Sequence, residues 1–156
     1  MAGEIRFEER AADDAQLLVL LKAAFAELVE RYGAVGRSQV KGDARYLVVL
    51  GDAGIAIGCG AVQAFGPGTE HPGDGELKRM YVVPGSRGRG YARALLGGLE
   101  ELARVAGHPV LRLATGERQP EGIALYESSG YARTAPWGKY VDQPLTHCYA
   151  KDLREL

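Results

Sequence analysis

The stretch Val82-Val-Pro-Gly-Ser-Arg-Gly-Arg-Gly-Tyr-Ala-Arg-Ala-Leu-Leu96 decides the fold. An apolar run leads into a glycine-rich turn, and a helical pattern of apolar residues follows the turn at once. Such a turn leaves several backbone N–H groups unpaired at the positive end of the helix dipole. Because Gly88 and Gly90 carry no side chain, an anion can approach this backbone closely. With arginines on both sides of the glycines, the stretch is typical of a phosphate or pyrophosphate cradle.

The turn fits neither of two common nucleotide-binding motifs. A Walker loop needs Gly-Lys-Ser or Gly-Lys-Thr, which the sequence lacks, and this weakens the hypothesis of a nucleotide-phosphate binder. A dinucleotide fingerprint needs a third glycine where Arg93 stands. A plain connection between a strand and a helix is the structural alternative, so the cradle needs support from the rest of the chain.

The segments around this stretch alternate between strand and helix patterns. The apolar spacing predicts strands at 5–7, 46–50, 55–65, 76–83, 110–114, from 131, and at 145–151. It predicts helices over about 13–32, over about 89–106 and from Pro120, with a short helical piece as one option in 34–44. This order predicts an α/β domain with one mixed sheet and helices packed on its faces.

Three segments, in the correct order, resemble the GNAT superfamily of N-acetyltransferases. Arg87–Ala92 matches the family motif Arg/Gln-x-x-Gly-x-Gly/Ala. Residues 76–83 look like the family's fourth strand, and residues 119–131 resemble its A-x-x-L-Y-E-x-x-G-F/Y segment. The resemblance extends from about residue 45 to residue 131. It implies a mixed, mostly antiparallel sheet of six to seven strands, flanked by about four helices, with a splay between strands 4 and 5.

The resemblance also implies acetyl-CoA as the co-substrate, bound without a metal. In the family, the amides of the glycine-rich loop grip the pyrophosphate of coenzyme A, and the edge of the fourth strand hydrogen-bonds the pantetheine arm. A backbone N–H at Met80 or Tyr81 would polarise the thioester carbonyl as an oxyanion donor. The cofactor-binding residues expected on this basis are Met80, Tyr81, Val82, Val83, Arg87, Gly88, Arg89, Gly90, Tyr91 and Ala92.

The resemblance assigns the acid–base chemistry to Glu76 and Tyr126. Glu76 would accept a proton from the attacking amine, directly or through water; the alternative is a solvated glutamate at a strand end. Tyr126 would give a proton to the departing thiolate; the alternative is a core tyrosine. The family's usual asparagine on the fifth strand is missing, and Thr115 or Gln119 could replace its contact with pantetheine.

These assignments predict an N-acetyltransferase that acts on a primary amine of a small molecule by direct transfer. The loop 136–140, which contains Trp137, is expected to line the acceptor pocket, and Tyr32 could reach the same cleft. Two alternatives stay open. One is an acetyltransferase for protein lysines or N-terminal amines, and the other is an acyl-CoA-binding sensor without turnover.

Composition narrows the remaining options. The 156 residues fit a single domain over 1–156, and the net charge of −1 argues against a nucleic-acid binder. Without a membrane-length apolar run or an apolar leader, a cytoplasmic location and no membrane partner are expected. Cys59 and Cys148 are interpreted as buried thiols, and the three histidines share no metal-ligand spacing. The family is frequently dimeric, so a homodimer is one option.

Overall fold

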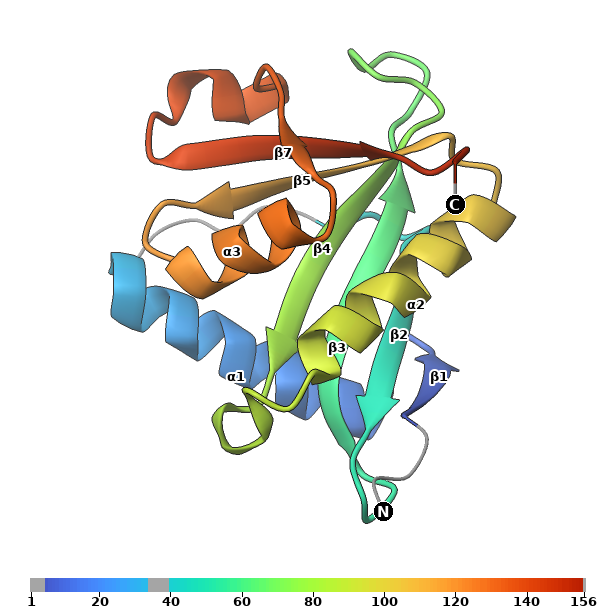
Figure 1. Cartoon of the computed structure of the whole chain (residues 1–156), viewed down its shortest axis with the longest axis vertical. Coiled ribbons are helices and arrows are strands. Elements are labelled where there is room, and N and C mark those ends of the chain that lie inside the picture. Colours follow the sequence, from blue (N-terminus) through green and yellow to red (C-terminus); the bar gives the residue numbers. More distant parts are fainter. Residues whose placement is uncertain (1–4, 34–39, 156) are drawn as a thin grey trace.

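The computed structural model describes residues 5–33 and 40–155 and contains one open seven-stranded sheet (Figure 1). The strand order is β1-β2-β3-β4-β5-β7-β6. Its elements are β1 (Arg6–Arg10), α1 (Ala15–Tyr32), β2 (Arg45–Leu50), β3 (Ala56–Ala64), β4 (Gly75–Val82), η1 (Pro84–Ser86), α2 (Tyr91–Val105), β5 (Val110–Gly116), α3 (Pro120–Ser128), β6 (Ala132–Arg133), η2 (Gly138–Asp142) and β7 (Thr146–Asp152). The two η segments are short 3-10 helices.

The sheet is antiparallel except between its two central strands. β4 and β5 run parallel, and only Gly75 with Leu111 and Glu76 with Arg112 are paired between them. Beyond Glu76 the two strands part, so the backbone edge of β4 lies open over most of its length. This is the expected splay between strands 4 and 5, and it confirms the predicted mixed sheet.

Each face of the sheet carries its own core. On β2, Leu47 and Val49 pack with α2 and α3, while Tyr46, Val48 and Leu50 pack with α1. Successive side chains of a strand point to opposite faces. Because helices cover both faces of β2, its residues from Tyr46 to Leu50 are all buried and mostly aliphatic instead of alternating with polar residues.

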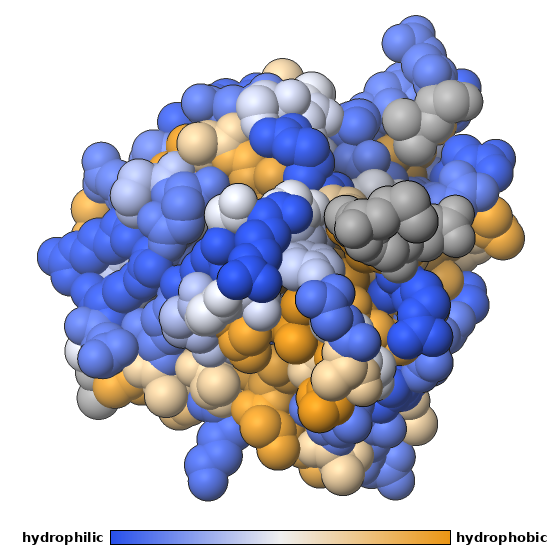
Figure 2. Space-filling model, turned by 60° about the horizontal axis from the view of Figure 1, so that its bottom comes forward, coloured by the Kyte–Doolittle hydropathy of each residue, from blue (hydrophilic) through white to orange (hydrophobic). Residues whose placement is uncertain are grey.

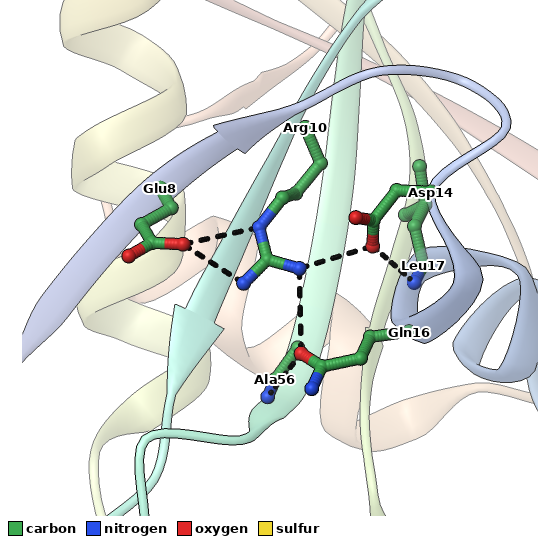
Figure 3. A network of polar contacts seen from close by, with 6 residues as sticks. All are labelled: Glu8, Arg10, Asp14, Gln16, Leu17 and Ala56. Atoms are coloured by element: carbon green, nitrogen blue, oxygen red, sulfur yellow. Dashed lines mark hydrogen bonds and ion pairs between the residues drawn. The ribbon is translucent and has the colours of Figure 1, made fainter.

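A polar network fixes the start of α1 against the sheet (Figure 3). The Asp14 carboxylate caps the helix by accepting a hydrogen bond from Leu17 N at 3.0 Å. The Arg10 guanidinium, at the end of β1, donates to Asp14, Glu8 and Gln16. Gln16 in turn accepts a hydrogen bond from Ala56 N at the start of β3, at 3.2 Å. Helix α1 is thereby held to two strands at its N-terminus.

The underside of the molecule in Figure 1 is turned toward the reader in Figure 2, where hydrophobic residues gather in one area among hydrophilic ones. Large apolar side chains are exposed along α1, namely Leu18, Val19, Phe25 and Val29. Phe25 and Val29, on the C-terminal half of the helix, line a cavity described below. The exposed surface of these two side chains therefore forms part of the wall of that cavity.

The elements follow the sequence prediction with small shifts. Helix α2 begins at Tyr91, after Gly90, and β1 runs to Arg10 where a strand over 5–7 was predicted. The described residues contain three α-helices and two 3-10 helices where about four helices were expected. Residues 34–39, within the segment where a short helical piece was one option, lie outside the described residues. Over the described ranges, no helix is both long and apolar enough to cross a membrane.

Candidate active site

A bulge interrupts β4 beside the splay. Tyr81 pairs with Cys59 and Lys78 with Ala61, so the two intervening residues, Arg79 and Met80, face the single Gly60 of β3. A β-bulge bends its strand and re-aims the side chains next to it. Arg79 has φ of 60°, a left-handed conformation that costs free energy in a residue other than glycine.

Gly60 leaves room for this bulge. A Cβ atom at this position would collide with the side chains of Leu99 and Met80. The bulge and the glycine opposite it therefore form one local feature of the β3–β4 pair. It lies where the open edge of β4 faces the splay.

The glycine-rich loop forms a cradle at the N-terminus of α2. Gly88 and Gly90 have φ of 79° and 85°, a region that L side chains rarely adopt. The first N–H groups of a helix have no partner within the helix, and the first residues of α2 line a cleft of about 400 Å³. Of the expected cofactor residues, those that line this cleft are Met80, Tyr81, Val82, Arg87, Gly88, Gly90, Tyr91 and Ala92.

Two of the expected cofactor residues, Val83 and Arg89, do not line this cleft. Val83 packs against the core on the α1 side, and its N–H donates to Ile57 O at 2.9 Å. Arg89 is exposed on the loop, and it is not among the residues that line the cleft.

The arginines beside the cradle hold its walls together. Arg87 donates to Val82 O at 2.8 Å and to Glu27 Oε2 of α1 at 2.6 Å. Arg93 donates to the hydroxyls of Ser128 and Ser129 at 2.8 and 3.0 Å, joining α2 to the end of α3. These hydrogen bonds fix both guanidinium groups at the wall of the cleft, which Arg87 and Arg93 line together with the glycines.

A second cavity, of about 170 Å³, occupies the splay and brings Glu76 and Tyr126 together. Glu76 is 7% exposed. Its carboxylate accepts a hydrogen bond from Gln63 Nε2 at 3.0 Å and lies 3.5 Å from Lys78 Nζ. Glu76 is therefore a buried, partnered carboxylate, and the alternative of a solvated strand end is wrong.

Lys78 is a site residue that the sequence prediction missed. Its ammonium donates to Tyr140 Oη at 3.3 Å, and burial lowers the pKa of Lys78. Glu76 and Lys78 are two residues apart, so they share a face of β4. That spacing was a usable signal, but the burial of Lys78 depends on Tyr140, which comes from a distant segment.

Tyr126 lies between the cradle and the splay cavity and lines both. It is 7% exposed, and its ring packs edge-on against Tyr131 with centroids 5.8 Å apart. Burial raises the pKa of Tyr126 well above its usual range, so the phenol keeps its proton at neutral pH. Tyr126 is both a core residue and part of a cavity wall. Its packing in the core is therefore compatible with the predicted role as a proton donor.

A third cavity, of about 590 Å³, opens on the other side of the splay. Tyr32 of α1 lines it together with Lys139 and Tyr140 of η2, as expected for these two segments. Trp137 does not line it. It is 5% exposed and packs with Phe65 and Cys148 in a small core. We call this space the outer cavity.

Thr115 and Gln119 lie where all three cavities meet, since both line each of them. They are the residues expected to replace the missing asparagine. Thr115 lies near the end of β5 and Gln119 directly before α3, and both line the splay cavity beside β4.

The cysteines and histidines lie outside this chemistry. Cys59 and Cys148 are buried free thiols, as predicted, and burial raises the pKa of Cys59 to about 12. His108 Nδ1 is 2.9 Å from Gly73 O, and His147 Nδ1 is 3.1 Å from an Arg133 nitrogen. In the ranges 5–33 and 40–155, no group of three or more potential ligands is placed to hold a metal ion.

Comparisons with known proteins agree with this geometry. The acetyltransferase (GNAT) family model matches residues 15–131. An IAA acetyltransferase of Azospirillum brasilense is 42% identical over 113 residues, which make up 72% of this chain and 71% of that protein. A solved structure from Klebsiella pneumoniae, assigned as an acyl-CoA N-acyltransferase, has a TM-score of 0.80 at 30% identity and covers 96% of this chain and 97% of its own.

A more distant solved structure shares the fold. It is a Salmonella typhimurium protein, assigned as an acetyltransferase, with its cofactor acetyl-CoA. Its TM-score is 0.70 at 20% identity, with 97% of this chain and 96% of that chain covered.

Proposed function

The chain belongs to the GNAT family of acetyltransferases, and on that premise we propose that it transfers the acetyl group of acetyl-CoA directly to the primary amine of a small molecule. One observation carries the proposal. The cleft beside the glycine-rich cradle, a splay cavity with a buried carboxylate and phenol, and an outer cavity meet at Thr115 and Gln119. A donor and an acceptor can enter this path from opposite ends.

The cofactor end would use backbone groups. The N–H groups of the Arg87–Ala92 loop would bind the pyrophosphate, and the positive end of the α2 dipole would favour its charge. The open edge of β4, from Met80 to Val82, would pair with the amides of the pantetheine arm as a further strand does. Thr115 and Gln119 offer side-chain hydrogen bonds to the same arm.

The reaction would proceed as one substitution at the thioester carbon. The neutral amine attacks, the N–C bond forms, the C–S bond breaks, and the ammonium proton is taken up by Glu76 or by a water beside it. Lys78 and Gln63 hold the Glu76 carboxylate in place. The N–H of Met80 or Tyr81 would stabilise the negative charge that develops on the carbonyl oxygen.

Tyr126 would act on the leaving group. Because burial raises the pKa of Tyr126 above that of a thiol, the phenol would first stabilise the departing thiolate by donating a hydrogen bond. The proton balance closes when coenzyme A leaves as its free thiol: Tyr126 would pass its proton to the thiolate, and the proton that Glu76 or its water took from the amine would return to Tyr126 through solvent.

A small acceptor fits the outer cavity. Its volume of about 590 Å³ falls in the range of small-molecule sites, about 300–1,000 Å³. The name of the Azospirillum brasilense relative, an IAA acetyltransferase, also favours a small molecule over a protein lysine or N-terminal amine. We propose in addition that residues 1–156 act as one domain, because all seven strands join one sheet. A cytoplasmic location and a homodimer stay predictions.

The test is to titrate the purified protein with acetyl-CoA by calorimetry and then to follow release of free coenzyme A thiol over a panel of amines. Saturable binding with amine-dependent thiol release is the expected result. Binding without release on any amine, together with unchanged behaviour of Glu76→Gln and Tyr126→Phe variants, would instead favour the sensor. Absence of binding would overturn the proposal.

A further inference from the structure

The splay cavity contains a primary amine that belongs to the protein itself. Lys78 of β4 lines this cavity together with Glu76 and Tyr126. The side chain of Lys78 is 8% exposed, so a reagent reaches its ammonium through the cavity rather than from bulk solvent. Under the proposed function, the thioester of acetyl-CoA enters the same space. A site that acetylates primary amines therefore has one in its own wall.

Lys78 lies within reach of the position expected for the thioester. The oxyanion donor is expected at the backbone N–H of Met80 or Tyr81, on the same strand. A strand rises about 3.3 Å per residue, so the Cα atoms of Lys78 and Met80 are at most about 7 Å apart. A lysine carries its ammonium on a flexible four-carbon stem. Rotation about the single bonds of this stem can bring Nζ of Lys78 to an acyl carbon held at the donor.

The surroundings of Lys78 Nζ favour its use as a nucleophile. Nζ lies 3.5 Å from Glu76 Oε2, which can take up a proton, and donates to Tyr140 Oη at 3.3 Å. Burial, which outweighs the opposing attraction of Glu76, lowers the pKa of Lys78. A lower pKa raises the fraction of neutral amine at a given pH, and the neutral amine is the form that attacks a thioester. Lys78 thus has a base beside it and loses its proton more readily than an ordinary lysine.

The other lysines of the described chain lie elsewhere. Lys139 lines the outer cavity and not the splay cavity. Lys151 is paired with Glu100 at 3.0 Å and lines none of the three cavities. Lys22 is exposed on α1 and lines none of them either. Transfer within the splay cavity would therefore select Lys78, whereas chemical acetylation from solvent would select exposed lysines such as Lys22.

We propose that, when no acceptor amine is bound, the protein transfers the acetyl group of acetyl-CoA to Nζ of its own Lys78. The inference rests on the proposed acetyl transfer and adds a modification site to it. Nζ attacks the thioester carbon, the N–C bond forms and the C–S bond breaks. The ammonium loses one proton to Glu76 or a water before the attack and a second proton as the amide forms. One of the two ends on the thiol of coenzyme A, and the other goes to solvent.

Acetylation of Lys78 would change the site in two ways. The amide is neutral, so Glu76 would lose the cationic partner that lies 3.5 Å from it. The added acetyl group would also occupy part of a cavity of only about 170 Å³. Self-acetylation is therefore expected to lower the rate of transfer to external amines. The modification would restrain the enzyme when acetyl-CoA is abundant and the acceptor is scarce.

The experiment incubates the wild-type protein with isotopically labelled acetyl-CoA in the absence of amine and locates acetyl groups by peptide mass spectrometry. Labelled and unlabelled acetyl groups are both read, so that acetylation before purification is also seen. Lys78 is expected to be acetylated at least about tenfold faster than Lys22, because the site holds amine and thioester together. Excess coenzyme A, which would occupy the cofactor cleft, should protect Lys78 and leave the labelling of Lys22 unchanged.

Three variants connect the modification to the site. Tyr126→Phe should slow the labelling of Lys78 by at least about tenfold, because the thiolate then leaves without a proton donor. Lys22→Arg, at the exposed position on α1, is the matched control and should label Lys78 at the wild-type rate. Wild-type protein acetylated in advance should release thiol with an amine more slowly, in proportion to the fraction acetylated. Lys78→Arg keeps the charge but has no primary amine, so preincubation with acetyl-CoA should not slow it.

The outcomes separate this inference from the proposed function. No acetyl group on Lys78, labelling no faster than that of Lys22, or labelling that excess coenzyme A does not reduce would overturn the inference. Amine-dependent thiol release by the same preparation would then leave acetyl transfer to an external amine standing. These results come from the wild-type protein and hold even where a variant does not fold. Absence of acetyl-CoA binding would overturn the proposed function and this inference with it.

Discussion

Removing the carboxylate of Glu76 should destabilise the protein by way of Lys78. The two charges lie 3.5 Å apart, and their side chains are 10% and 8% exposed. With an effective dielectric constant of about 20, Coulomb's law gives about 5 kcal/mol for unit charges at this distance. Lys78 can lose its proton when its partner is gone, which limits the penalty, so a coupling free energy of about 1–3 kcal/mol is expected.

A double-mutant cycle measures this coupling. Glu76→Gln, Lys78→Met and the double variant are unfolded in urea at neutral pH, and their free energies of unfolding are compared with the wild type. Glu76→Gln leaves a buried ammonium without its counter-ion, so the double variant should be more stable than Glu76→Gln alone. The exposed pair Glu101 and Arg104 provides a control cycle that should show little coupling.

The pH dependence has a definite sign. Burial lowers the pKa of Lys78 in the folded protein. At a pH between this lowered value and the ordinary lysine value of the unfolded chain, the unfolded chain therefore binds more protons than the folded chain. Stability therefore rises with pH between the folded and unfolded values of this pKa. Glu76→Gln removes an attraction that holds the pKa up and so widens the window, and its deficit against the wild type should shrink as pH rises above neutral. A coupling below about 0.5 kcal/mol, or a deficit that does not change with pH, would refute the reasoning.

Three further variants or reagents test other parts of the site. Tyr126→Phe should lower kcat by about 10²-fold or more in the thiol-release assay while leaving acetyl-CoA affinity within a few-fold; an unchanged kcat would remove Tyr126 from the chemistry. Gly90→Ala should weaken acetyl-CoA binding in calorimetry by at least about tenfold, because a side chain is strained at φ of 85°. Its control is Gly97→Ala at an open position on α2, which should bind normally and be stabilised by about 0.5–1 kcal/mol. Cys59, whose pKa burial raises to about 12, should react with a thiol reagent at pH 8 only after unfolding, and rapid labelling of the native protein would contradict the packing around it.

The parts of the fold that could be predicted are those whose signal is local. The strand, turn and helix over 82–96 need only apolar spacing and two glycines with positive φ. The strands flanking them are short apolar runs, and the open edge of β4 followed from the family resemblance once the segments stood in order. Boundaries shifted by one to three residues; the end of β1, for example, is set by its pairing with β2 rather than by its own apolar pattern.

The parts that were missed depend on contacts between distant segments. Nothing local to the Glu76-Leu-Lys78 run shows that Lys78 is buried, because Tyr140 lies 62 residues further along the chain. The bulge at Arg79 carries no glycine of its own; the space for it comes from Gly60 on the neighbouring strand. Trp137 was expected at a pocket wall, but Phe65 and Cys148, from two other segments, enclose it.

The cradle could be predicted from the sequence and the outer cavity could not, because the first is built from backbone atoms and the second from side chains. The cradle consists of backbone amides, so its sequence signal is the glycines that let the chain adopt the required φ values. The outer cavity consists of side chains from α1, the β4 bulge and η2, which are far apart in sequence and carry no shared motif. Under the proposed function, substitutions at Phe25 of α1 or at Lys139 of η2 would change the acceptor, because neither residue lines the cofactor cleft. If the outer cavity receives the acceptor as proposed, its side chains would then determine the acceptor class, whereas the glycine-rich motif would determine only the cofactor.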